Sequence, residues 1–191
     1  MTKRRKILLG ALAAAAALAL LFLFWDHDAP YTARVVDAES GKPVEGAIYL
    51  AVWWKNSAFK EKPWWEGPAT VMERFVEGRT GPDGIINVPG FWRRRIAFNP
   101  NTLTVYKPGY VLWFQEKIFP TYANRTDFGR EHRVVKLQRW MDTMLYGAHS
   151  RFLITATKGN LSHEVYESGE HVLQQTFDKH ESLLYQQERT R

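Results

Sequence analysis

Three residues near the C-terminal end carry the clearest metal-ligating spacing in the chain. His163, Glu167 and His171 are four residues apart, and on a helix such residues share one face and can bind one metal ion. The hydrophobic periodicity places all three in the middle of the polar face of a predicted helix. A solvated, charged face is therefore favoured, and we predict no metal site.

Recognisable catalytic motifs are absent from the sequence. Ser57 and Lys60 match the pattern Ser-x-x-Lys, but that chemistry also requires a helix beginning at the serine and partner motifs that the chain lacks. No zinc-peptidase, nucleophile-elbow, phosphate-loop or dinucleotide motif occurs, and Cys 0 excludes thiol chemistry and disulfides. We expect no catalytic residue and no cofactor. The alternative is a hydrolase in which Glu73 or Glu116 shares a pocket with a histidine.

Two short segments combine aromatic and cationic side chains. In a proline-flanked loop Trp64 and Trp65 are adjacent, so one ring is expected to be exposed unless the loop folds back and buries both. An exposed tryptophan can anchor a protein interface or stack on a sugar. For the run 91–95, a solvated basic turn near anionic lipid headgroups is favoured over a contact surface. The candidate partner-binding residues are Phe59, Trp64, Trp65, Trp92, Arg93, Arg94 and Arg95.

An apolar segment follows the basic N-terminus. Residues 7–25 contain no charged side chain, and four consecutive basic residues, 3–6, precede them. As a helix this segment would be roughly 28 Å long, which matches the hydrocarbon core of a bilayer. The basic cluster favours a cytoplasmic N-terminus. We predict a single-pass inner-membrane anchor over residues 1–25, a short linker over 26–30 and a periplasmic location for the rest.

The alternative is a cleaved signal peptide, which would leave a secreted or periplasmic protein. Signal peptides usually have a shorter apolar region that ends in small residues, whereas Phe22, Phe24 and Trp25 occupy that place. The net charge of +6 arises mainly from residues 3–6: 22 basic and 20 acidic residues follow them, which leaves +2. A nearly neutral exported part predicts no nucleic-acid partner.

Short apolar runs alternate with turn residues over residues 31–140. This pattern predicts an antiparallel β-sandwich of about seven strands. Proline and glycine mark residues 55–68 as a loop and residues 80–84 as a turn. The expected strands are 32–37, 47–53, 71–77, 85–88, 103–106, 111–116 and 133–139.

The last part of the chain, residues 141–191, contains no proline and no tryptophan. From His163 onward the apolar residues gather on one side when each position is advanced by 100°, which predicts an amphipathic helix. Asp142 can cap an earlier helix, whereas residues 152–155 can equally form a strand. This helical tail either packs on the sandwich or binds a partner.

Three turn sequences occur in the order of a known family. They are Gly-Lys-Pro-Val-Glu-Gly-Ala at 41–47, Thr-Gly-Pro-Asp-Gly at 80–84 and Lys-Pro-Gly-Tyr at 107–110. Together they resemble the carboxypeptidase regulatory-like domain, a transthyretin-like, Ig-like β-sandwich common in exported bacterial proteins. The resemblance implies the fold, with Gly84 and Gly109 supplying positive φ, and it implies no peptidase activity.

The sequence therefore predicts a non-catalytic, membrane-anchored module of the periplasm that binds another envelope protein or a glycan. The long loop before Thr80 and the tail beyond Trp140 lie outside the family pattern, so we expect the individual function to reside there. The alternative function is an envelope hydrolase whose active site has no recognisable motif.

Overall fold

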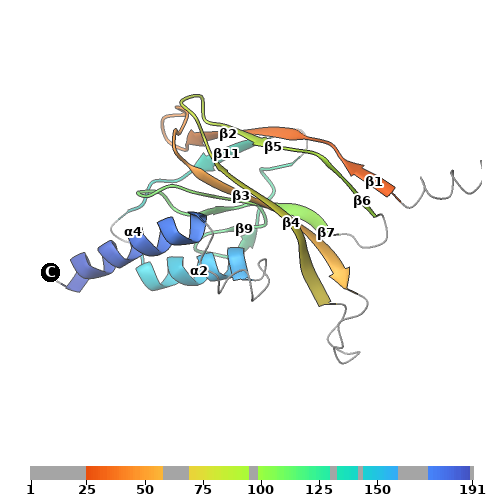
Figure 1. The fold of residues 1–191 in the computed structure, drawn as a ribbon. Coiled ribbons are helices and arrows are strands. Elements are labelled where there is room, and N and C mark those ends of the chain that lie inside the picture. The colour runs from red at the N-terminus through yellow and green to blue at the C-terminus, as the bar shows by residue number, and fades with distance from the viewer. Residues whose placement is uncertain are drawn as a thin grey trace, which may run out of the picture.

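The computed structural model describes the chain in six stretches, 25–57, 69–94, 99–129, 133–141, 144–158 and 172–189. Within them the chain is mainly β, with two helices near the C-terminal end (Figure 1). The strands are β1 (Trp25–Asp28), β2 (Tyr31–Asp37), β3 (Ile48–Ser57), β4 (Ala69–Arg79), β5 (Ile85–Val88), β6 (Phe91–Arg94), β7 (Asn99–Tyr106), β8 (Trp113–Phe114), β9 (Lys117–Ile118), β10 (Ala123–Asn124) and β11 (Val134–Leu137). The helices are α2 (Tyr146–Lys158) and α4 (Val172–Arg189).

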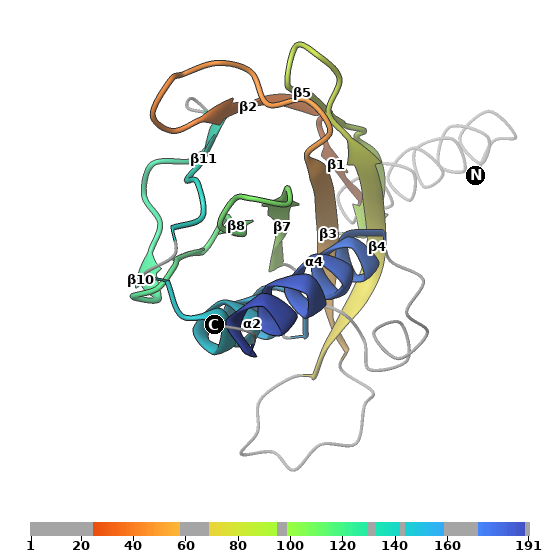
Figure 2. The same cartoon turned by 90° about the vertical axis from the view of Figure 1, so that its left-hand side faces the viewer.

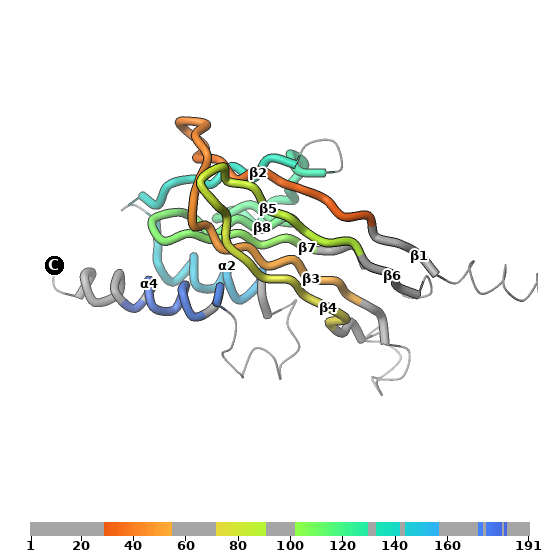
Figure 3. The backbone as a smooth tube through the Cα atoms, turned by 45° about the horizontal axis from the view of Figure 1, so that its top comes forward, coloured from red at the N-terminus to blue at the C-terminus, as the bar shows by residue number. Residues whose placement is uncertain are grey.

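Two larger sheets form the body of the protein. Their strand orders are β11-β2-β5 and β4-β3-β7-β8, and β1–β6 and β9–β10 form two-stranded ribbons. Figure 3 shows the long strands running lengthwise beside one another. β3 is central in the larger sheet, because β4 pairs with it along its whole length and β7 pairs with it from Ile48 to Trp54.

β1 and β6 continue the ladder of β2 and β5 without a register shift. The break between the two ladders contains Pro30 on one strand and Pro89 on the other. Proline has no N–H to donate, so hydrogen bonding across a ladder is interrupted at such positions. The result is one long antiparallel ribbon that begins at Trp25.

The two larger sheets enclose a buried cluster. Alternate side chains of β3 face it, and its members from β2, β5 and β11 are aliphatic, as the alternation along those strands predicts. The cluster consists of Ala33, Val35, Val44, Ala47, Tyr49, Ala51, Trp53, Ile86, Val88, Leu103, Val105, Trp113, Val135 and Leu137.

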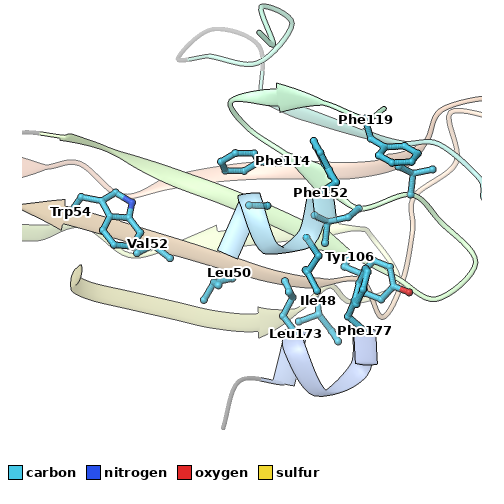
Figure 4. Close-up of a cluster of buried hydrophobic side chains, with 14 residues drawn as sticks. Ile48, Leu50, Val52, Trp54, Tyr106, Phe114, Phe119, Phe152, Leu173 and Phe177 are labelled. Carbon is cyan, nitrogen blue, oxygen red and sulfur yellow. The ribbon is translucent and has the colours of Figure 1, made fainter. Parts of the chain in front are cut away.

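The opposite face of the larger sheet is covered by α2 and α4 (Figure 2). A second buried cluster lies there, in which Phe152 and Phe177 of the helices pack against Ile48 and Leu50 of β3 (Figure 4). The helical tail therefore packs on the sheet and forms part of the core. The cluster consists of Ile48, Leu50, Val52, Trp54, Tyr106, Val111, Leu112, Phe114, Phe119, Phe152, Leu153, Ala156, Leu173 and Phe177.

The family-like turn sequences form turns. Gly84 and Gly109 have φ of 71° and 83°, as predicted. A Cβ on Gly84 would also overlap the carbonyl oxygen of Val35. Between two of these turns, Thr80 Oγ1 donates to Val44 O at 2.7 Å and accepts from Ala47 N–H at 2.9 Å. These two hydrogen bonds join the end of β4 to the segment that leads into β3.

Several strand boundaries differ from the prediction. β3 continues through Ser57, so residues 55–57 are strand and not loop. Trp25, expected to end the anchor, begins β1, and residues 26–28 of the expected linker belong to the same strand. β11 pairs with β2 in parallel, whereas the prediction was antiparallel. The two strands are about a hundred residues apart, and local sequence patterns do not encode whether such strands pair in parallel or antiparallel.

The helices resolve one ambiguity. Residues 152–155 lie inside α2, so the strand alternative was wrong. The buried Phe152 ring packs there against Phe114, Phe119 and Tyr122. Residues 163–171 of the predicted amphipathic helix lie outside the described residues, and α4 covers its remainder to Arg189.

Within the described stretches, neither helix combines the length and the apolar character needed to cross a bilayer. The predicted anchor falls on residues 1–24, which lie outside the described part, and on Trp25.

Candidate functional site

The predicted contact residues fall on two segments. Phe59, Trp64 and Trp65 lie outside the described residues, in the connection between β3 and β4, and Arg95 also lies outside them. The other predicted residues, 92–94, belong to β6, where Trp92 pairs with His27, Arg93 with Asp26 and Arg94 with Trp25.

The β3–β4 hairpin carries its connection beyond the rest of the sheet. β7 pairs with β3 only as far as Trp54, whereas β4 remains paired to the end of the hairpin, where Ser57 faces Ala69. From Lys55 to Ser57, β3 pairs with β4 on one edge and, among the described residues, with no strand on its other edge. The loop that contains the predicted tryptophans therefore starts from an extended two-stranded arm (Figure 1).

A buried carboxylate organises the turn after β2. Asp37 is 3% exposed; its Oδ1 accepts the main-chain N–H groups of Glu39 and Ser40 and the hydroxyl of Ser40. Its Oδ2 accepts the Tyr110 hydroxyl at 3.0 Å and Arg139 Nε at 2.8 Å. The carboxylate thus joins three segments that are distant in the sequence.

These contacts shift the pKa values of Asp37, Tyr110 and Arg139. The hydrogen bond from Ser40 N–H, followed by those from Arg139, the Ser40 hydroxyl and Tyr110, holds the pKa of Asp37 well below its usual range despite burial. Burial and the bond to Asp37 raise the pKa of Tyr110, and the bond to Asp37 raises that of Arg139. The ionised form of Asp37 is therefore favoured, and both of its carboxylate oxygens accept structural hydrogen bonds.

The sequence analysis missed the Asp37 group. An aspartate that precedes a serine by three residues at the end of a strand is typical of a side-chain-stabilised turn, and this signal was available. The contributions of Tyr110 and Arg139 depend on tertiary structure, since they lie 73 and 102 residues away.

Other polar side chains also bind the main chain. His149, 1% exposed, accepts the N–H of Leu112 through Nε2 at 2.8 Å, so that nitrogen carries no proton. The Glu77 carboxylate on β4 accepts the N–H groups of Val172 and Leu173 at 3.0 and 2.7 Å. These are the first residues of α4, and an anion at a helix N-terminus is favourable. The first contact attaches α2 to the segment before β8, and the second attaches α4 to β4.

A cavity of about 190 Å³ lies beside β11 and β8. Apolar residues line one part of it, among them Leu112, Ile118 and Phe119, and polar residues line the rest. The other lining residues are Ala38, Val111, Trp113, Arg125, Asp127, Lys136 and Gln138. Arg125 is held in place, because its Nε donates to Phe114 O at 2.9 Å, its Nη1 pairs with Asp127 at 3.1 Å and its guanidinium lies over the Trp113 ring.

The cavity occupies a seam between the two larger sheets. At one end the edges meet: Tyr110 bridges to Arg139, and Val111 N–H donates to Gln138 O at 2.8 Å. The cavity is lined on one side by Lys136 and Gln138 and on the other by Val111, Leu112 and Trp113, which lead into β8.

The residues proposed for catalysis or metal binding are not gathered in the described structure. No group of three His, Asp or Glu side chains suited to a metal occurs in the described stretches, and residues 163–171 lie outside them. Glu73 and Glu116 do not line the cavity, and neither does a histidine. Ser57 lies on a strand and not at a helix start.

Comparisons with protein-family models, with curated proteins and with solved structures give no match to the chain.

Proposed function

We propose that the protein is a non-catalytic binding or scaffolding module, anchored in the inner membrane by residues 7–25 and exposed to the periplasm. Its partner would be another envelope protein or a glycan. The two packed sheets would be a transthyretin-like sandwich of the carboxypeptidase regulatory-like kind, an assignment supported by the three turn sequences and by the positive φ of Gly84 and Gly109.

The observation that carries this proposal is the use made of buried polar groups. Asp37, Thr80 and His149 are nearly inaccessible, and each bonds to main-chain atoms that shape a turn or attach a helix. A catalytic group must instead reach a substrate. A scaffold built in this way supports binding by the segments it presents.

The β3–β4 arm is the first such segment. Photoreactive residues at Trp64 and Trp65 in the full-length chain, irradiated in native membranes, should crosslink a defined partner. Glu45 is the control position: it is exposed and precedes Ile48, the first residue of β3, which is roughly 30 Å by strand length from Ser57, the last residue of β3. Equal crosslinking from Glu45, or none from either tryptophan, would remove the loop as the interface.

The location has its own test. Fractionation should recover the full-length chain with the inner membrane, and its C-terminus should be accessible to protease only after the outer membrane is opened. Recovery of the full-length chain in the cytosol would contradict the location and the partner class. Turnover of peptides, esters or glycans by the purified chain, abolished by Glu73→Gln or Glu116→Gln, would favour the hydrolase alternative.

A further inference from the structure

The ribbon of β1 and β6 lies at the end of the module where the predicted anchor joins it. Figure 3 shows β1 and β6 at one end of the long strands and α4 towards the other. β1 starts at Trp25, the last residue of the apolar segment. Antiparallel pairing places Arg94, the last residue of β6, directly opposite Trp25, and the Cα atoms of such pairs are about 4.5–5.5 Å apart. The register therefore fixes Arg94 at the level where the chain would leave the bilayer.

The charge of this ribbon changes sign along its length. At the first level of pairing the charged residue is Arg94. At the next level Asp26 faces Arg93, so the two charges cancel, and two levels further on Asp28 faces an uncharged residue. Three residues of strand span about 10 Å, slightly more than one Debye length at physiological ionic strength. An anionic surface at the level of Arg94 would thus attract the near end of the ribbon, while the repulsion of Asp28 is screened.

A tryptophan beside a basic residue suits the boundary between membrane and water. Tryptophan is enriched at the level of the headgroups, and one arginine near an anionic membrane strengthens attachment about fivefold. Another arginine of the same ladder gives the contrast. Arg34 on β2 is roughly 30 Å from Trp25 by strand length, which is beyond the range of the surface potential. Position along the ladder therefore decides which arginine can reach the lipid.

We propose that the Trp25–Arg94 end of the ribbon docks on anionic phospholipid headgroups of the membrane that holds the anchor. This contact is a second attachment of the module, beside the chain itself, and it limits how far the module tilts about the anchor. Two observations favour lipid over a protein partner: the chain outside the described part ends at Trp25, and the positive end of the ribbon is at that level. The inference rests on the proposed function, since it requires the anchor, and it assigns the β6 segment to lipid.

The test compares the full-length chain in two kinds of lipid nanodisc. One kind contains phosphatidylcholine alone, and the other also contains phosphatidylglycerol, which is anionic. Hydrogen exchange of β1 and β6, measured by mass spectrometry, should be up to about fivefold slower in the anionic discs. The difference should disappear at high salt, which screens the surface charge. β2 and β5 lie further along the ladder and should exchange equally in both.

Variants separate a contact of Arg94 from a general effect of the charged surface on exchange. Arg94→Gln removes the charge and should abolish the difference between the two lipids, whereas Arg94→Lys keeps the charge and should preserve it. Arg34→Gln is the matched control, because it removes the same charge from an exposed position far along the ladder. A difference that persists in Arg94→Gln, or that Arg34→Gln reduces equally, would overturn the proposal.

A soluble phosphate compound is the competing ligand of the same chemistry. Glycerol phosphate is added in solution to the unchanged protein in phosphatidylcholine discs. It should not slow the exchange of β1 and β6, because the proposed contact depends on a charged surface at the level of Trp25. Slowing equal to that in the anionic discs would indicate a soluble ligand and would contradict docking on lipid.

The lipid contact and the proposed function can fail separately. Retention of the chain by both kinds of disc tests the anchor, and it does not require anionic lipid. A retained chain whose β1 and β6 exchange equally in the two lipids would overturn the contact and leave the anchor in place. A chain recovered outside both kinds of disc would contradict the anchor and the contact together.

Discussion

The two faces of β3 are buried by different partners. Ala47, Ala51 and Trp53 on one face meet the smaller sheet, whereas Ile48 and Leu50 on the other meet α2 and α4. The first core is made of segments between residues 33 and 137 that the sandwich prediction already grouped together. The second depends on helices from outside that region. Because α2 and α4 supply side chains to the second core, the tail is part of the folded core and not a separate appendage.

Truncation after Arg139 should have the largest effect, because it removes the helix side of the core and leaves the other side in place. It removes Phe152, Leu153, Leu173 and Phe177, which are at most 2% exposed, and leaves one face of the sheet open to water. We expect loss of the cooperative thermal transition and aggregation, measured by circular dichroism and light scattering. A chain that ends after Arg189 is the control. An intact transition in the truncated chain would make the tail an accessory.

A matched pair of leucines tests whether the two cores are equivalent. Leu153→Ala on the helix side and Leu103→Ala between the sheets both empty a fully buried site, and each should lower the free energy of unfolding by about 2–5 kcal/mol. Chemical denaturation of the two variants gives the comparison. A cost below about 1 kcal/mol for Leu153→Ala alone would mean that α2 is loosely attached.

The difference in Tm between Asp37→Asn and the unchanged protein should depend on pH. Because its pKa is lower in the folded chain than in the unfolded chain, the ionised carboxylate stabilises the fold above about pH 4, and this contribution is lost as the pH falls through the lower, native pKa. The deficit in Tm of Asp37→Asn should therefore be constant near neutrality and shrink below about pH 4.

Ser40→Ala is the control for this profile, since it removes one donor and keeps the carboxylate. It should retain the acid-dependent fall in Tm. Parallel curves for Asp37→Asn and the unchanged protein down to about pH 2 would show that Asp37 is not a native-state anion.

The smallest effect is expected at the attachment of α4. Glu77→Gln keeps an oxygen for the N–H groups of Val172 and Leu173 but removes the charge at the helix N-terminus. The free energy of unfolding should fall by about 0.3–1 kcal/mol, and the fall should be smaller at high salt. Glu73→Gln, on the same strand and exposed, is the control. An equal effect of both changes would reduce the Glu77 contact to general surface charge.

Local sequence patterns predicted the elements that depend on local physics. Strand β5 has the predicted boundaries, and Gly84 and Gly109 adopt the conformation that their turns require. The alternation of polar and apolar residues could not show which face of β3 meets which layer, because all residues from Ala47 to Trp54 are apolar and both faces are buried. Such a run is typical of a strand covered on two sides, and this signal would have indicated that a second element covers β3.

The candidate site was less accessible to prediction. Two-residue strands such as β8 have no periodicity to detect, and the cavity is lined by segments that are distant in the sequence, among them residues 111–113 and 136–138. The parallel pairing of β11 with β2 places Lys136 beside the cavity. That pairing joins residues about a hundred positions apart, so no short window contains it.

The ribbon of β1 and β6 leaves almost no slack at the N-terminal side of the module. Pairing starts at Trp25, so only Ala29 and Pro30 interrupt the ladder between the end of the predicted anchor and the body of the protein. If residues 7–25 span the bilayer as predicted, the module would stay close to the lipid surface, and only a partner at that height could bind it.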